Sequence, residues 1–151
     1  MVKKNDLHLH LISDSTGETV HQFARAGLAQ FPDTNITEHI WTLVRNKAHI
    51  DAIERNLEKN PGVVLFSVVN KEVREMLKTT STTALFVTHD QLEAFNLGDK
   101  VGILKDGQLQ QWDSPYHIYH EPKNIDIAKF IGQGALINGF QDGDTVNTAL
   151  G

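Results

Sequence analysis

The chain has 151 residues, 40% hydrophobic and 22% charged, a composition that excludes a disordered or fibrous protein and a length of about one domain. It contains no cysteine, which excludes a disulfide scaffold and a thiolate metal site, and it has neither a membrane-spanning apolar run nor a signal sequence, so we expect a cytoplasmic protein. The whole net charge of −5 lies in residues 79–151, and without a basic stripe no nucleic acid partner is expected.

Residues 7–78 alternate between strand and helix patterns. Strands are predicted where β-branched, aromatic or alternating apolar residues run together, at 7–12, 37–44 and 63–68. Ser15 and Glu18 have the spacing of a capping box, which predicts the start of the first helix, and Pro32 ends it. The second helix stops at Asn60-Pro61-Gly62. A third is marked by four apolar residues at helical spacing: Val69, Val73, Met76 and Leu77.

The second half begins with another short apolar strand, 84–88, which leads into a helix. Strands at 101–104 and 108–112 flank Asp106-Gly107, a dipeptide typical of a hairpin turn. Ser114-Pro115 and Asn124 each open a short helix. After Gly132 only weak strand patterns remain, at 135–137 and 145–150.

Together these elements predict an α/β fold. It consists of a mostly parallel sheet of βα units with about four strands, followed by a β-hairpin and short C-terminal helices. The hairpin either extends that sheet or forms a second part, and the sequence leaves both arrangements open.

The DSTGET turn is the most distinctive sequence motif of the first half. It lies in HLHLISDSTGETVHQFARAGLAQF, which is followed by EHIWTLVRNKAHIDAIERNLEKNPGVVLFSVVN and KEVREMLK. Residues 7–78 therefore resemble the N-terminal part of the kinase-pyrophosphorylases that regulate pyruvate phosphate dikinase and phosphoenolpyruvate synthase. The resemblance implies reversible phosphorylation of a threonine in a target enzyme, with ADP as donor. That family's glycine-rich phosphate loop lies further downstream, and no G-x-x-x-x-G-K-[ST] stretch occurs in the 151 residues.

The second half carries a different text, TALFVTHDQLEAFNLGDKVGILKDGQLQQWDSPYHIYHEPKNIDIAKFIG, then GQGALINGF and VNTALG. The spacing from THDQ to the DG turn, the SP turn and FIG makes residues 83–151 similar to the C-terminal part of an ABC importer ATP-binding subunit of the ferric-iron type. The resemblance implies an ancestral membrane permease partner. It also implies that His89 is the switch histidine that contacts the terminal phosphate. The Walker A, signature and Walker B motifs precede THD in that family and have no counterpart here.

The two resemblances divide the chain into three parts. They imply that residues 1–78 are a βαβαβα segment like that of the regulatory family and that residues 79–131 are the end of an ABC-type nucleotide-binding domain. Residues 132–151 look like the truncated start of an accessory domain, and we expect them to be poorly ordered. The junction between the families lies within residues 70–83.

His89 is the candidate catalytic residue. It follows a strand whose carboxyl end would face the ligand crevice of an open α/β sheet, where an imidazole can donate to a phosphate. Without a phosphate loop, the alternative role of capping a helix is favoured, and His89 is then orphaned as a catalyst.

The second candidate site is the polar turn after the first strand. Ser13, Ser15, Thr16 and Gly17 offer hydroxyls and backbone N–H groups that could bind a phosphate or nucleotide. The same residues are good turn and cap formers, and that structural role is favoured. His8 and His10 share a strand face, but the sequence offers no third ligand nearby, so no metal site is predicted.

Three functions are compatible with these residues. The first is a fused, truncated protein with remnants of a serine/threonine kinase-phosphorylase and an ABC-type ATPase, without complete catalytic activity. The second is a regulatory module that binds ATP or ADP with Mg²⁺. The third is a non-catalytic domain that binds another protein chain through uncovered apolar faces. The first interpretation is favoured, because phosphoryl transfer requires several positioned parts that act together.

Overall fold

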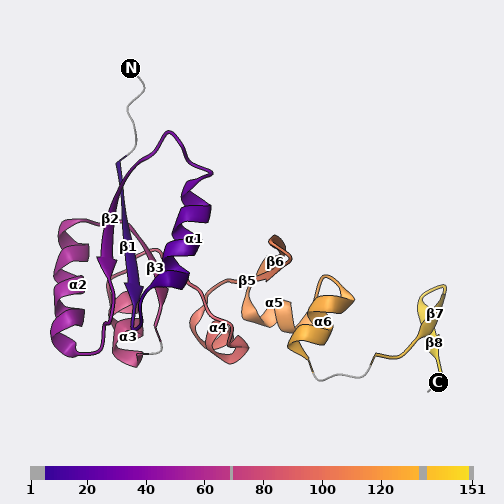
Figure 1. Ribbon diagram of the computed structural model, residues 1–151. Helices are drawn as coiled ribbons and strands as arrows, with labels where there is room; N and C mark the ends of the chain where they lie inside the picture. Colours follow the sequence, from indigo (N-terminus) through magenta and orange to yellow (C-terminus); the bar gives the residue numbers. More distant parts are fainter. Residues whose placement is uncertain (1–5, 69, 133–135, 150–151) are drawn as a thin grey trace. The chain divides into compact units, whose positions relative to one another are not determined.

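A computed structural model describes residues 6–68, 70–132 and 136–149. They form two compact units, Met1–His89 and Asp90–Gly151, each of which is described by itself. The first unit contains, in chain order, β1 (Asp6–Ser13), α1 (Glu18–Leu28), β2 (Asn35–Trp41), α2 (Lys47–Lys59), β3 (Val63–Ser67), α3 (Lys71–Thr79) and β4 (Ala84–Phe86) (Figure 1).

The first unit is built on a four-stranded parallel sheet in the order β2-β1-β3-β4. β1 is central and pairs with β2 from Asp6 to Ile12 and with β3 from Leu9 to Ser13. This arrangement confirms the predicted α/β class and its mostly parallel sheet. β2 ends at Trp41, three residues earlier than predicted, and Leu43 just beyond it has a left-handed backbone with φ 55°.

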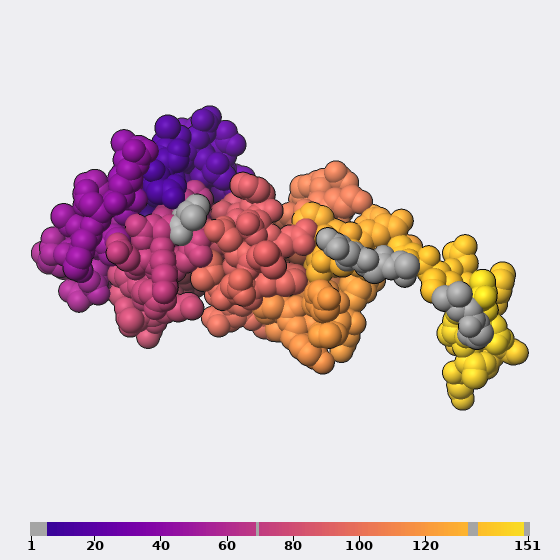
Figure 2. All heavy atoms as spheres, turned by 90° about the horizontal axis from the view of Figure 1, so that it is seen from below, coloured from indigo at the N-terminus to yellow at the C-terminus, as the bar shows by residue number. Residues whose placement is uncertain are grey.

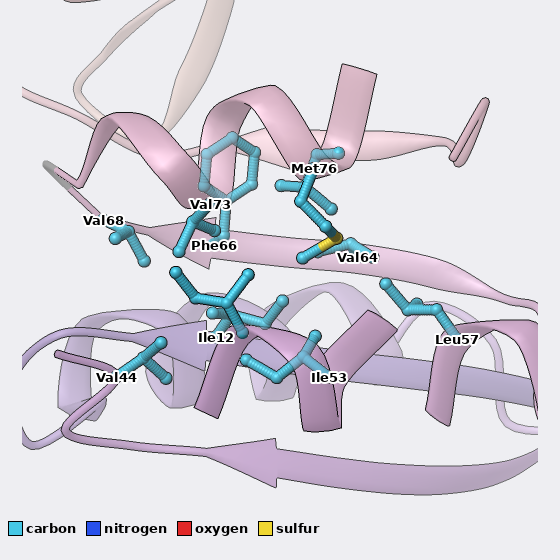
Figure 3. Close-up of a cluster of buried hydrophobic side chains, with 11 residues drawn as sticks. Ile12, Val44, Ile53, Leu57, Val64, Phe66, Val68, Val73 and Met76 are labelled. Atoms are coloured by element: carbon cyan, nitrogen blue, oxygen red, sulfur yellow. The ribbon is translucent and has the colours of Figure 1, made fainter. Parts of the chain in front are cut away.

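The helices cover the two faces of this sheet unequally. α1 lies on one face, where Val20 and Ala24 join a cluster with Leu9, Leu11 and Leu65. α2 and α3 lie side by side on the other face (Figures 1 and 2). They enclose the larger cluster (Figure 3), made of Ile12, Val44, Ile50, Ile53, Leu57, Val64, Phe66, Val68, Val73, Met76 and Leu77.

The predicted capping box at the start of α1 is wrong. The N-cap residue is Gly17, with φ 81°, and no side chain caps the helix. Ser15 cannot act as the cap because Glu18 is already the first helical residue. The hydroxyl that turns back onto the backbone is instead that of Ser13, whose Oγ accepts the N–H of Ser15 at 3.2 Å.

Asparagine side chains start the other two helices of this unit. Asn46 accepts the N–H of His49 at α2, and Asn70 accepts the N–H of Glu72 at α3. α2 ends at Lys59 with Asn60 as its C-cap, so the predicted stop is confirmed. The predicted helix residue Val69 lies outside the described residues.

The second unit contains α4 (Gln91–Leu97), β5 (Val101–Lys105), β6 (Gln108–Asp113), α5 (Pro115–His120), α6 (Ile125–Ile131), β7 (Gly139–Asp142) and β8 (Thr145–Thr148). β5 and β6 form the predicted antiparallel hairpin as a separate two-stranded sheet. Asp106 and Gly107 both have positive φ, the backbone that a tight hairpin turn requires. A small core of Val101, Ile118 and Ile127 holds the hairpin, α5 and α6 together.

The last described residues form a second hairpin, β7–β8. Its side chains are largely exposed, including Phe140 at 82% and Val146 at 62%. The strand predicted at 135–137 is not found at residues 136 and 137, and Ala135 lies outside the described residues.

Candidate functional site

The parallel sheet grows in opposite directions from its two central strands, β1 and β3. α1 carries the chain from β1 outward to β2, whereas α3 carries it from β3 outward to β4 on the opposite face. β1 and β3 are neighbours, so a crevice is expected between their carboxyl ends, and ligands of open α/β sheets bind at such points. The register places Ser13 opposite Ser67 there.

The turn of residues 13–17 fills this edge of β1. Ser13 is buried, with 2% of its surface exposed, while Ser15 and Thr16 are exposed. Gly17 has no side chain that could cap α1, so the N-cap residue leaves the backbone N–H groups of the first turn uncapped. The turn can therefore offer two hydroxyls and a helix amino end to an anion.

The loop after β2 braces this turn. The N–H of Val44 donates to the Ser13 carbonyl at 3.0 Å, and the N–H of Leu43 donates to the Ser15 carbonyl at 3.1 Å. Arg45 is exposed, and its Nε donates to the Asp14 carbonyl at 3.4 Å. An exposed guanidinium therefore lies beside the candidate turn.

Sequence reasoning missed both Arg45 and Ser67. Ser67 is the last residue of β3 and Arg45 follows β2, but only the strand order brings them to the turn after β1. A general rule could have pointed to these two residues, because the carboxyl ends of neighbouring parallel strands, and the segments that follow them, meet at one edge of the sheet.

Gly17 tests how tightly the turn is built. We expect Gly17→Ala to lower the free energy of unfolding by about 1–2 kcal/mol, the cost of a left-handed backbone for an L-residue. The new Cβ would also lie 2.9 Å from Cγ2 of Thr42, a side-chain methyl group that can shift. Urea unfolding of Gly17→Ala, and of Gly17→Ala with Thr42→Ser, separates the two contributions. Unchanged stability in both variants would contradict the prediction.

His89 lies at the same sheet edge, after β4. Beyond the strand, the Val87 N–H still donates to the Phe66 carbonyl at 3.0 Å, and His89 follows as an exposed residue. It does not serve as the helix cap, because the Asp90 carboxylate accepts the N–H groups of Leu92 and Glu93 at the start of α4. β3 lies between the strands that carry His89 and the 13–17 turn, so the two candidates share an edge without adjoining strands.

Two surface hollows lie elsewhere in the first unit. One, of about 280 Å³, is bordered by α2 and α3 and lined by Asp51, Glu54 and Glu72. The other, of about 600 Å³, is lined by Glu54, Glu58 and the threonine-rich segment 79–83. Lys47 also lines the first hollow, where it pairs with Asp51. The other charged groups of both hollows are carboxylates, which repel a phosphate, whereas the turn of residues 13–17 has one carboxylate, Asp14, with the Arg45 guanidinium beside it.

The described part of the chain also lacks two other features. Within it, no group of three or more His, Asp or Glu side chains is placed to hold a metal ion. Over the same residues, every helix is too short or too polar to cross a bilayer.

Two families of relatives match the chain, and the stretches that they match overlap. Putative pyruvate, phosphate dikinase regulatory proteins match the first part, and that of Sphingopyxis alaskensis is 49% identical over 72 residues, 48% of this chain and 27% of the relative. A protein of the same name from Rhizorhabdus wittichii is 34% identical over 151 positions, covering 95% of this chain and 54% of the relative.

ATP-binding proteins of importers match the other part. The osmoprotective compounds uptake ATP-binding protein GgtA of Synechocystis is 46% identical over 82 residues, 54% of this chain and 22% of the relative. The spermidine/putrescine import ATP-binding protein PotA of Aster yellows witches'-broom phytoplasma is 39% identical over 99 residues, 66% of this chain and 24% of the relative. Both resemblances noted in the sequence are thus confirmed.

The chain spans between 22% and 54% of the length of these relatives. A family model described as kinase/pyrophosphorylase matches residues 9–103, a stretch from β1 into β5. Because that match covers more than half of the 151 residues, the chain belongs to the kinase/pyrophosphorylase family.

Proposed function

We propose that the chain is a fusion of two nucleotide-handling parts, in which neither part catalyses phosphoryl transfer or ATP hydrolysis by itself. One part is the βαβαβα segment of the kinase/pyrophosphorylase family, and the other is related to the ATP-binding proteins of importers. His89 then occupies the position of a switch histidine, but the Walker A, signature and Walker B motifs with which such a histidine acts are absent from the 151 residues.

The composition of the carboxyl edge is the observation that carries this proposal. The edge presents a hydroxyl-lined turn, the Arg45 guanidinium and the His89 imidazole. Phosphoryl transfer is mostly positioning, which requires a phosphate cradle, a lysine and a magnesium-holding acid to act together. The 151 residues contain no phosphate-loop sequence that could supply the cradle.

A second candidate function is favoured by the turn itself. The uncapped amino end of α1, the hydroxyls of Ser15 and Thr16 and the guanidinium of Arg45 are suited to a single phosphate group. ADP or ATP bound there through one phosphate would make the first unit a regulatory module that binds nucleotide without turnover.

Steady-state hydrolysis and calorimetric titration of the full chain separate these functions. We expect no ATP hydrolysis above that of His89→Ala, and no ADP-dependent phosphorylation of pyruvate, phosphate dikinase. Steady hydrolysis that is lost in His89→Ala would overturn the fusion proposal.

Titration with ADP, ATP and Mg²⁺ tests the second candidate. Saturable binding lost in Arg45→Gln, and retained in Arg55→Gln on the exposed side of α2, would establish the regulatory module. Equal heats for both variants would exclude it.

A further inference from the structure

Three imidazoles meet on one sheet face, in the amino-terminal half of β1. His39 on β2 is the register partner of His10. Their rings stack with centroids 4.5 Å apart and planes 11° apart. On its other side, Nε2 of His39 lies 3.0 Å from Nδ1 of His8, so one of these nitrogens donates to the other. This histidine cluster (His8, His10 and His39) is distinct from the candidate site, which lies at the carboxyl ends of the strands.

His10 is the best-defined member because its protonation state follows from its contacts. The ring is fully buried, and its Nε2 lies 2.8 Å from the carbonyl oxygen of Asn60, the C-cap of α2. A carbonyl only accepts, so Nε2 carries the hydrogen and donates it. Nδ1 is buried and has no hydrogen-bond partner among the residues that the structure describes. A second proton would therefore create a buried charge and an N–H with no acceptor, which is costly.

The surroundings offer little to offset that charge. The titratable and charged groups on the packed elements are Asp6 on β1, Glu38 on β2, and seven residues of α2: Lys47, His49, Asp51, Glu54, Arg55, Glu58 and Lys59. None of them acts on the pKa of His10, which responds to burial, to the Asn60 carbonyl and to the other two histidines. Asp6 accepts a hydrogen bond from the Asn35 side chain, strand alternation turns Glu38 to the opposite face, and Glu58 and Lys59 are exposed. β3 contributes no charged residue.

The histidines also repel one another once they are protonated. Burial lowers the pKa of His10 below its usual 6.5, the Asn60 hydrogen bond opposes this, and the charges of His39 and His8 add to the lowering. Burial likewise lowers the pKa of His39, and His8 adds to it. The rings of His10 and His39 are therefore most stable side by side while both are neutral.

We propose that the histidine cluster is an acid-sensitive latch, which holds edge strand β2 against β1 while the rings are neutral and loosens that strand when they become protonated. β2 has β1 as its single strand neighbour. Most of its side chains are exposed, and His39 is one of the three that are partly buried. His39 therefore shares the side-chain attachment of β2 with Ile36 and Trp41, which pack against the two apolar clusters.

The direction of the pH dependence follows from the lowered pKa values. The unfolded strand takes up protons near the usual 6.5, whereas the folded cluster takes them up only at lower pH. The latch therefore contributes its full stability above about pH 6.5 and loses it as the pH falls below that value, until the folded-state pKa values are reached.

Amide hydrogen exchange on the full chain, corrected for intrinsic exchange rates, tests the latch. Between about pH 7.5 and about pH 5.5, we expect β2 protection to fall, by at most about tenfold for each histidine whose pKa is lowered. The central strand β3 serves as the internal reference and should lose less. Equal changes in β2 and β3, or none in either, would overturn the proposal.

Two variants and one direct observation complete the test. His39→Phe keeps a stacked ring without a titratable nitrogen, and it should flatten the pH dependence of β2. His49→Gln, an exposed histidine on α2, should keep the wild-type dependence. Independently of any variant, nitrogen NMR of the wild-type chain should show His10 as a neutral ring protonated at Nε2 in the folded state. A doubly protonated His10 in a chain with intact β2 protection would contradict the latch.

Discussion

Gly62→Ala is expected to destabilise the first unit by about 3 kcal/mol or more, the upper range for forcing extra volume into a packed site. Gly62 lies just before β3, where the chain passes close to β1. A Cβ at this position would lie 2.0 Å from the carbonyl oxygen of His8 and 2.7 Å from its carbonyl carbon. These atoms cannot move aside easily, because β1 is hydrogen-bonded to strands on both sides.

Gly27→Ala is the matched control for this substitution. Gly27 lies within α1, and a Cβ added there would meet no atom within 4 Å outside its chain neighbours and the backbone of its own helix. There the same change should stabilise the helix by about 0.5–1 kcal/mol. Urea unfolding followed by Trp41 fluorescence reports on the first unit when Trp112, the other tryptophan, is replaced by phenylalanine. Equal midpoints for the Gly62 and Gly27 variants would show that the close approach to His8 is not as described.

Ile53→Ala should cost about 2–5 kcal/mol, the range for truncating a fully buried isoleucine. Ile53 projects from α2 into the larger cluster and is completely buried. Figure 3 shows it among Ile12, Val44 and Leu57. The shortened side chain leaves a cavity between α2 and the sheet. The cavity cannot collapse fully, because the helix and the strands are each held in place by their own backbone hydrogen bonds.

Ile53→Val and Ile40→Ala set the scale in the same fluorescence assay. Removing one methylene at Ile53 should cost about 0.5–1.5 kcal/mol. Ile40 lies on edge strand β2 with 52% of its surface exposed, so its truncation should cost less than Ile53→Ala. A loss below about 1 kcal/mol for Ile53→Ala would mean that α2 does not pack on the sheet as described.

Local sequence patterns were sufficient for the order and type of the elements from β1 to α6. The apolar run that forms β3 and the alternation in β1 each specify a strand from neighbouring residues alone. Asp106-Gly107 specifies a hairpin because few residues adopt two successive positive φ angles. Such signals are local, and they do not depend on which strands become neighbours.

The site and the histidine cluster depend on contacts that no local pattern contains. His39 lies 31 residues from His8 in the chain, and only the parallel register brings the two rings together. The Ser15–Glu18 spacing misled because Gly17 adopts a left-handed backbone that moves the helix start. Arg45 joins the turn through the strand order, which alternation of apolar residues does not encode.

The central place of β1 also has a consequence for synthesis of the protein. β1 is made before both of its partners, and one of them, β3, follows much later, so that His10 and its acceptor Asn60 are fifty residues apart. While the chain emerges from the ribosome, the apolar side chains of Leu9 and Leu11 stay exposed to water until β3 has been made. Pairings between distant residues form slowly. The nascent first unit is therefore most exposed to aggregation, and most in need of a chaperone, before β3 has been translated.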